Sequence, residues 1–131
     1  FRRAMIRIAN IIATKIDAVA LVTGDSVGQV ASQTLSNLRA VSDTSNLPIL
    51  RPLSGMNKED IINRAVKIGT YDISIEPYED CCSFFVPPHP ETKAKLDQVN
   101  QISSKIDMDD IYVNTMSNIE LHEFKYRGDL D

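Results

Sequence analysis

The sequence predicts an α/β domain in which crossover helices cover a parallel sheet. Amphipathic stretches with helix spacing alternate with short apolar runs along the first half of the 131 residues, an order typical of parallel sheets. The first apolar run, residues 18–24, is continuous, which indicates a strand that is buried on both faces. The hydrophobic share of 43% and the charged share of 24% are ordinary for a globular domain with one core.

Three segments begin the alternation. Apolar side chains recur at helix spacing in residues 2–16, which predicts the first helix. The run AVALVTG, residues 18–24, predicts a strand. Residues 27–38 again have helix spacing, and we expect Asp25 or Ser26 to be the N-cap of this second helix.

The next segments continue the same order. The run LPILRP, residues 47–52, predicts a second strand bounded by prolines. The stretch NKEDIINRAVKIG predicts a third helix, with Asn57 and Asp60 as a near capping box and Gly69 as its end. A further short extended piece is expected at residues 69–75.

The second half of the chain is less regular. Residues 76–92 are rich in proline and acidic residues and predict a long loop. Helix spacing resumes in residues 91–105. We expect a short helix at residues 109–116 and a strand at residues 118–124.

Charge and cysteine content restrict the setting of the chain. Its net charge of −4 argues against a role as the main nucleic-acid contact, because phosphate binding needs a basic surface. No apolar run approaches the ~18 residues of a membrane span, so no membrane contact is expected. Cys81 and Cys82 are adjacent, unlike the separated pairs of structural disulfides, which favours a reducing cytoplasm. The chain opens on Phe1, within helix spacing and without a capping residue, so we expect a piece of a longer protein.

The stretch ALVTGDSVGQVASQT forms a candidate binding corner. Gly24 ends the first predicted strand, and ligands of open parallel sheets bind beyond such ends, beside the next helix N-terminus. Gly24 and Gly28 would let a ligand approach the backbone, and Gln29 and Gln33 would share one helix face. This arrangement suits a phosphate or a base edge, but a plain strand-to-helix turn with solvent-facing glutamines explains the residues equally well. Neither a Walker loop nor a dinucleotide fingerprint is present.

Three stretches, LVTGDSVGQVASQTLSNLR, ILRPLSGMNKEDIINRAVKIGT and YEDCCSFFVPPHP, together resemble tRNA 4-thiouridine synthetases of the ThiI type. The resemblance runs from residue 1 to about residue 90 and continues more loosely to the end. It implies that residues 1–131 are the C-terminal part of a PP-loop ATP pyrophosphatase domain, with the phosphate-binding loop and an RNA-binding module upstream. Such enzymes adenylate a uridine of tRNA with ATP, replace the activated oxygen with persulfide sulfur, and also supply sulfur for thiamine synthesis. The chain alone is therefore expected not to adenylate tRNA.

The resemblance also implies site residues. Arg2, Gly24 and Gln33 would contact ATP, with Mg²⁺ accompanying the nucleotide. The residues alone favour a different interpretation of Arg2, a solvated surface charge beside Arg3 and Arg7. Asp25 stands where the family usually has glutamate, which keeps the charge but shortens its reach, so no role is assigned to that side chain.

The adjacent cysteines are the candidates for sulfur chemistry, which needs a thiolate. By resemblance Cys81, in the run Glu79-Asp80-Cys81, would form a disulfide with the persulfide carrier or carry sulfur itself. Cys82 stands where some relatives have glycine and is the second choice. The neighbouring acidic residues would raise the pKa of either thiol. From the residues alone, both cysteines could be small buried hydrophobes.

No metal site is expected. The two histidines, His89 and His122, have no convergent partners at zinc-ligand spacing. The acidic run at residues 106–111 lacks the glycine and the final glutamate of a calcium loop and suits a helix N-terminus.

The resemblance implies tRNA, bound chiefly by the upstream module, and a cysteine desulfurase as partners. Two other functions stay open. The first is a different PP-loop enzyme, such as another tRNA thiolase or an NAD synthetase-like amidotransferase, which would have no need of Cys81. The second is a docking or homodimerisation module, since an uncovered sheet edge favours self-association.

Overall fold

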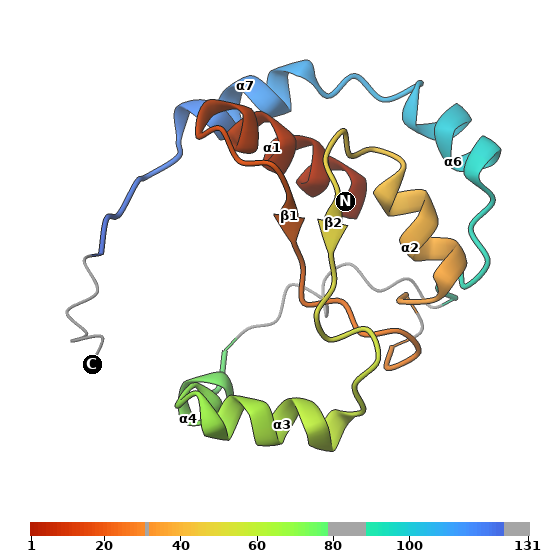
Figure 1. Ribbon diagram of the computed structural model, residues 1–131. Coiled ribbons are helices and arrows are strands. Elements are labelled where there is room, and N and C mark those ends of the chain that lie inside the picture. The colour runs from red at the N-terminus through yellow and green to blue at the C-terminus, as the bar shows by residue number, and fades with distance from the viewer. Residues whose placement is uncertain (31, 79–88, 125–131) are drawn as a thin grey trace.

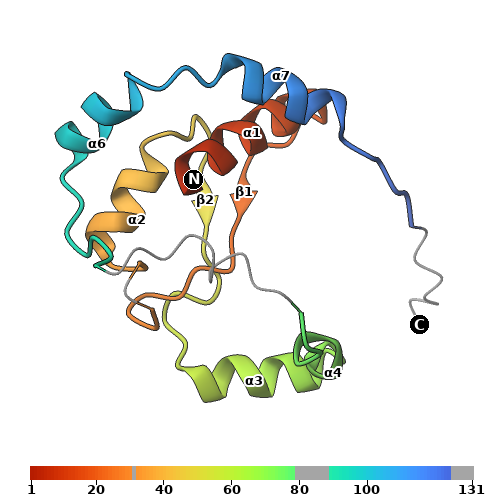
Figure 2. The ribbon, with the colours of Figure 1, turned by 180° about the vertical axis from the view of Figure 1, so that it is seen from behind.

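The computed structural model describes residues 1–30, 32–78 and 89–124. In chain order the elements are α1 (Arg2–Lys15), β1 (Leu21–Val22), α2 (Leu35–Ser42), β2 (Ile49–Leu50), α3 (Lys58–Lys67), α4 (Tyr71–Ser74), α6 (Leu96–Ser103) and α7 (Asp109–Ser117). The predicted order of helix, strand, helix, strand and helix is confirmed. Figures 1 and 2 show α1, α2, α6 and α7 gathered around the strands, with α3 and α4 apart at the end toward which both strands run.

The two strands are parallel, and α2 crosses between them. Leu21 lies opposite Ile49, and Val22 lies opposite Leu50. The expectation that the first strand is buried on both faces is wrong, because Val22 is 69% exposed, and Leu50 of β2 is likewise 54% exposed. Burial alternates along each two-residue strand, so the described helices cover only one face of this sheet.

The core lies between α1 and α2. Ile6 and Ala13 are buried on α1, and their spacing of two helical turns places them on one face. Leu38 and Ala40 are the buried apolar residues of α2. This packing places the start of α1 and the two strand ends near one another (Figure 1).

The predicted helix over residues 27–38 is wrong in its bounds. Thr34, not Asp25 or Ser26, is the N-cap, and its hydroxyl accepts a hydrogen bond from the Asn37 N–H at 3.2 Å. Gly28 has φ +79°, a left-handed conformation that a helix cannot contain. The preceding residues therefore form a loop, and α2 begins only at Leu35.

The third helix is confirmed together with its cap. The Asp60 N–H donates to Asn57 Oδ1 at 2.9 Å, and the Asn57 N–H donates to Asp60 Oδ2 at 3.2 Å. Gly69 has φ +75° just beyond the helix, as expected of a terminating glycine. The extended piece expected at residues 69–75 is wrong, because the chain turns there into the short helix α4, whose Ser74 N–H donates to the Thr70 carbonyl.

The end of the described chain is helical rather than extended. The predicted helix over residues 91–105 is confirmed as the shorter α6, and the one over 109–116 is confirmed as α7. The strand expected at residues 118–124 is wrong: the Asn118 side chain donates to the Asn114 carbonyl at 2.7 Å, which ends α7, and no strand follows up to residue 124. Most of the loop predicted over residues 76–92 lies outside the described residues. No helix in the described ranges is both long and apolar enough to cross a bilayer.

Candidate functional site

A buried carboxylate lies where the two parallel strands end. Thr23 and Asp25 follow β1, and Arg51 follows β2, so the parallel register brings all three to the same edge of the sheet. Asp25 is only 5% exposed. It forms ion pairs with Arg2 at the start of α1 and with Arg51, whose Nε lies 3.2 Å from Oδ2. The Thr23 hydroxyl donates to the same carboxylate at 2.8 Å. We call these four residues the Asp25 cluster.

The Asp25 cluster carries a net positive charge. Burial of Asp25 acts to raise the pKa of its carboxyl, but the Thr23 hydrogen bond, the charge of Arg2 and the hydrogen bonds from both arginines outweigh it. The pKa of Asp25 therefore lies below its ordinary value, and two guanidinium groups share one carboxylate. The Arg51 side chain is 16% exposed and that of Arg2 is 34% exposed, so Arg2 is the cation more open to an anionic ligand.

Gln33 holds the loop that follows the cluster. Its side-chain oxygen accepts a hydrogen bond from the Ser26 N–H at 2.9 Å, and its backbone carbonyl accepts one from the Gly28 N–H at 3.1 Å. Ser26 is 4% exposed, and its hydroxyl donates to the Met56 carbonyl at 3.2 Å. The backbone of this loop is therefore held by hydrogen bonds to Gln33 and to the Met56 carbonyl.

The three residues expected to contact ATP surround a single buried dipeptide. Arg2 pairs with Asp25, Gln33 binds the Ser26 backbone, and Gly24 comes directly before this pair. A Cβ built on Gly24 would have no heavy atom within 4 Å, so the described chain leaves space beside this backbone. Open backbone next to a net positive charge suits an anionic ligand.

Two features of the corner differ from the sequence expectation. Gln29 and Gln33 do not share a helix face, because both lie in the loop before α2. Arg51 and Thr23 were not expected at the site. The signal for Arg51 was present, because it directly follows β2 as Thr23 directly follows β1, and ends of parallel strands meet at one edge.

Cys81 and Cys82 lie outside the described residues, together with Glu79 and Asp80, so the expected cysteine site stays a prediction. His122 is described, and its Nε2 lies 3.4 Å from Glu120 Oε2 on an exposed segment. Within residues 1–30, 32–78 and 89–124, no three His, Cys, Asp or Glu side chains are grouped so that they could hold a metal ion.

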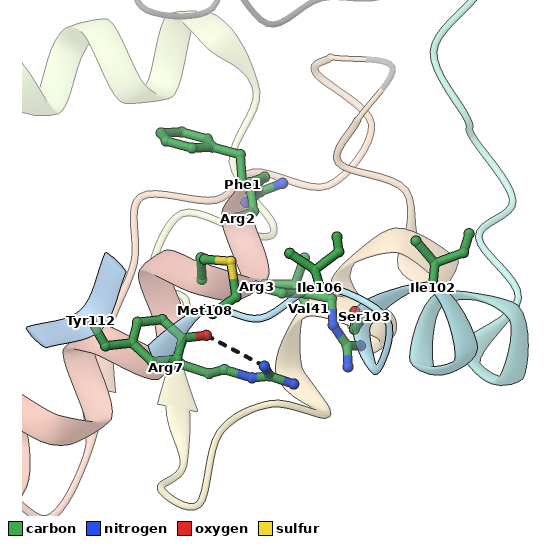
Figure 3. A pocket seen from close by; sticks show the side chains of 11 residues that line it. Phe1, Arg2, Arg3, Arg7, Val41, Ile102, Ser103, Ile106, Met108 and Tyr112 are labelled. Carbon is green, nitrogen blue, oxygen red and sulfur yellow. Dashed lines mark hydrogen bonds between the residues drawn. The ribbon is translucent and has the colours of Figure 1, made fainter. Parts of the chain in front are cut away.

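A pocket of ≈ 280 Å³ lies beside the first turns of α1. It is lined by residues of α1, α2, α6 and α7 and of the segment that joins α6 to α7 (Figure 3). In this pocket Arg7 Nη1 donates to the Tyr112 hydroxyl at 3.3 Å. Arg2 also lines the pocket, which therefore adjoins the Asp25 cluster.

The comparisons with known proteins agree with one another. The family model described as "Thiamine biosynthesis protein (ThiI)" matches residues 1–108. A probable tRNA sulfurtransferase of Acetivibrio thermocellus is 50% identical over 120 residues, which are 92% of this chain and 31% of that protein. One of Natranaerobius thermophilus is 48% identical over 130 residues, 98% of this chain and 32% of that protein. This chain thus spans about a third of the length of these curated relatives.

A solved structure supports the same direction. It is described as a crystal structure of a 4-thiouridine synthetase–RNA complex with bound ATP. It is 42% identical in sequence and has a TM-score of 0.82, and the match covers 89% of this chain and 31% of that chain. The expected α/β fold class is therefore confirmed by both the strand topology and this neighbour.

Proposed function

Because this chain belongs to the ThiI family, we propose that it forms the ATP-facing, C-terminal part of the catalytic domain of a tRNA sulfurtransferase that makes 4-thiouridine. One observation carries the proposal: Arg2, Gly24 and Gln33 gather around the buried Asp25–Ser26 dipeptide at the carboxyl ends of parallel strands. Ligands of open parallel sheets bind at such edges. A sulfur supply for thiamine synthesis belongs to the same proposal, since the family model carries that description.

Each residue of the corner has a distinct role in this proposal. ATP supplies the adenylyl group that activates a uridine oxygen of tRNA for replacement by sulfur. Arg2 binds a phosphate or the base. The ion pair with Asp25 restricts the Arg2 guanidinium to one orientation. Gln33 keeps the loop backbone in position, and Gly24 leaves room for the ligand. Mg²⁺ is proposed only as the companion of the triphosphate, which is how that ion is usually held in nucleotide sites.

Sulfur transfer is proposed for the cysteine pair. In one version the outer sulfur of a carrier persulfide displaces AMP from the activated uridine, and the Cys81 thiolate then attacks the inner, carrier sulfur, so that a Cys81–carrier disulfide forms and 4-thiouridine leaves. In the other version the Cys81 thiolate takes the outer sulfur and releases the carrier thiol, and Cys82 is the second choice for either role. A cysteine desulfurase is the proposed sulfur donor, tRNA the proposed substrate and the reducing cytoplasm the proposed location. The phosphate-binding loop and the RNA-binding module are proposed to lie upstream of this segment in the complete enzyme.

The ATP site can be tested with matched glycine substitutions. The experiment uses a full-length tRNA sulfurtransferase in which this chain replaces the matching segment of the Acetivibrio thermocellus relative, named here the chimeric enzyme. Gly24→Ala adds a methyl group that touches nothing in the described chain, so we expect the fold to persist and ATP binding to weaken roughly tenfold. Isothermal titration calorimetry measures the Kd.

Gly55→Ala is the matched control, because Gly55 also has nothing within 4 Å of a built Cβ and also lies on an exposed loop. It should change the Kd by less than about twofold, within the spread of neutral surface changes. Unaltered ATP binding by Gly24→Ala would contradict the assignment of this corner.

The cysteine assignment needs a cellular measurement. In cells that lack their own enzyme, the chimeric enzyme is expressed with Cys81→Ser or Cys82→Ser, and 4-thiouridine in tRNA is measured by mass spectrometry. We expect Cys81→Ser alone to abolish the modified base, because sulfur transfer needs a thiolate. Normal modification by both variants would remove the sulfur-transfer role of the cysteine pair and leave the ATP-facing corner as the only part of the proposal that this chain carries.

A homodimer is a further proposed assembly, and one observation favours it. No residue of α3 or α4 is buried, although both helices carry large apolar side chains. Val66, Ile68, Ile73 and Ile75 are all more than half exposed. Uncovered apolar surface of this kind marks an interaction site.

A further inference from the structure

Arg2 and Arg51 bind different oxygens of the same buried carboxylate. Arg2 contacts Asp25 Oδ1, whereas Arg51 Nε donates to Asp25 Oδ2 at 3.2 Å. The Thr23 hydroxyl also donates to Oδ2, at 2.8 Å. The two oxygens of Asp25 thus serve different partners, and the contact with Arg51 does not compete with the contact with Arg2.

Arg51 has a second anchor on α2. Its Nη2 donates to the Ser42 hydroxyl at 2.8 Å, and that hydroxyl donates to the Leu38 carbonyl at 2.7 Å. Leu38 is one of the buried core residues. At the strand ends, the Thr23 N–H donates at 3.0 Å to the carbonyl of Leu50, the residue before Arg51. The Arg51 guanidinium is therefore fixed between α2 and the sheet.

Arg2 is held less firmly than Arg51. In the described part of the chain its guanidinium has one partner, the Asp25 carboxylate, and its side chain is the more exposed of the two. A carboxylate that orients a cation also cancels much of the charge that the cation offers to a ligand. Arg2 and Asp25 alone would therefore present an oriented but nearly neutral pair to an anion.

We infer that Arg51 is a positioning residue that neutralises Asp25, so that Asp25 can orient Arg2 while the charge of Arg2 stays available to an anionic ligand. This inference rests on the proposed function, in which the ligand is the triphosphate of ATP. Two guanidinium groups and one carboxylate leave one net positive charge at the strand ends. Arg51 acts through Asp25 and not on the ligand, because its Nε and Nη2 are already bonded within the chain.

A conservative substitution separates the charge of Arg51 from its structural contacts. In the chimeric enzyme, Arg51→Gln removes the charge, whereas Arg51→Lys keeps it but loses the planar group that binds Asp25 and Ser42 together. In about 50 mM salt, we expect ATP to bind roughly tenfold more weakly to Arg51→Gln, and to bind Arg51→Lys within about threefold of the unaltered enzyme. Isothermal titration calorimetry measures each Kd.

Arg39→Gln is the matched control, because it removes the same charge from an exposed site on α2. It should change the Kd for ATP by less than about twofold. Circular dichroism checks that each variant is folded. If Arg51→Gln does not fold, Arg51→Lys carries the test, and a tenfold loss of affinity in folded Arg51→Lys would overturn the inference.

Salt provides a readout that a purely structural role would not move. The loss of affinity in Arg51→Gln should shrink to less than about threefold in about 0.5 M salt, because mobile ions screen the charge that ATP meets. A misplaced loop would instead weaken ATP binding by the same factor at both salt concentrations.

A double substitution tests whether Arg51 acts through Asp25. Asp25→Asn combined with Arg51→Gln removes one negative and one positive charge, so the net charge at the strand ends equals that of the unaltered enzyme. The new amide oxygen at position 25 can still accept a hydrogen bond from Arg2. We expect the double variant to bind ATP at least about threefold more tightly than Arg51→Gln alone.

The outcomes are distinct. The inference is overturned by unchanged ATP binding in Arg51→Gln, by equal losses in Arg51→Gln and Arg51→Lys that salt does not reduce, or by a double variant that binds no more tightly than Arg51→Gln. Absence of ATP binding by the unaltered chimeric enzyme would instead mean that the proposed function itself has failed, and the role of Arg51 would fall with it.

Discussion

Among single residues, Asp25 has the largest influence on the charge distribution at the ends of the two strands. Its carboxylate is buried, but it has three partners, two of them cationic. An unpaired buried carboxylate would take up a proton, whereas one with charged partners stays ionised. The sequence expectation assigned this side chain no role in ligand binding because of its short reach. The structure instead places it at the centre of the cluster, where a short side chain suffices because Arg2 reaches toward it.

The lowered pKa of Asp25 leads to a pH prediction for the stability of the chain. A group whose pKa is lower in the folded state stabilises that state at pH values above its ordinary value, which is 3.8 for this carboxyl. This contribution is lost as the pH falls through the lower, folded pKa. We therefore expect the free energy of unfolding of the unaltered chain to drop as the pH is taken below about 4. In Asp25→Asn that acid-dependent drop should be largely absent.

The same substitution should also cost stability at neutral pH. Breaking a fully buried ion pair costs ~3–5 kcal/mol, and we expect on the order of 1–3 kcal/mol here because Arg2 keeps partial access to water. Urea unfolding followed by circular dichroism at pH 3, 5 and 7 measures both effects. Asp43→Asn is the control, since Asp43 pairs with Arg3 at 3.8 Å on a more exposed site. Identical pH profiles for the unaltered chain and Asp25→Asn would contradict the prediction.

At the scale of elements, α3 shows where a helix can be predicted from this sequence. The residues that begin and end it are adjacent to it in the chain. Asn57 and Asp60 mark the start of α3, and Gly69 marks its end. The structure confirms all three. The second helix failed for a physical reason of the same kind. Its spacing is helical from residue 27, but Gly28 takes a left-handed conformation and the chain bonds to itself through Gln33. Such a loop is stabilised by contacts across several residues, which periodicity does not encode.

The candidate site likewise contains residues that could be predicted from the sequence and residues that could not. Gly24 was marked by its place at a strand end and Gln33 by its spacing from Gln29, although the helix face expected of that pair does not exist, whereas Arg2 was identified by resemblance alone. Arg51 was missed because the second strand was considered without its register against the first. The hydrogen bond from the Asn37 side chain to the Glu91 carbonyl, at 2.6 Å, depends on tertiary structure alone, because no local pattern relates positions more than fifty residues apart.

At the scale of the whole chain, the described residues form a packed body around α1 and α2 and an arm made of α3 and α4. The buried apolar residues lie on α1 and α2, whereas none lies on α3 or α4, which extend away from the other helices (Figures 1 and 2). A helix with one apolar face is stable in water only when something covers that face. The arm joins the body next to the strand-end corner, through the segment that carries Met56, so whatever covers the arm lies near the proposed ATP site.

We predict that the arm supports self-association of the chain. Val66 and Ile73 are 57% and 70% exposed, so replacing both with lysine should leave the fold within about 0.5 kcal/mol while removing apolar contact area. Size-exclusion chromatography with light scattering should then give a dimeric mass for the unaltered chain and a monomeric mass for the double variant. Val113→Lys is the matched control, because Val113 is equally exposed at 70% but lies on α7. A monomeric unaltered chain, or equal dissociation by the control, would show that the arm serves another contact.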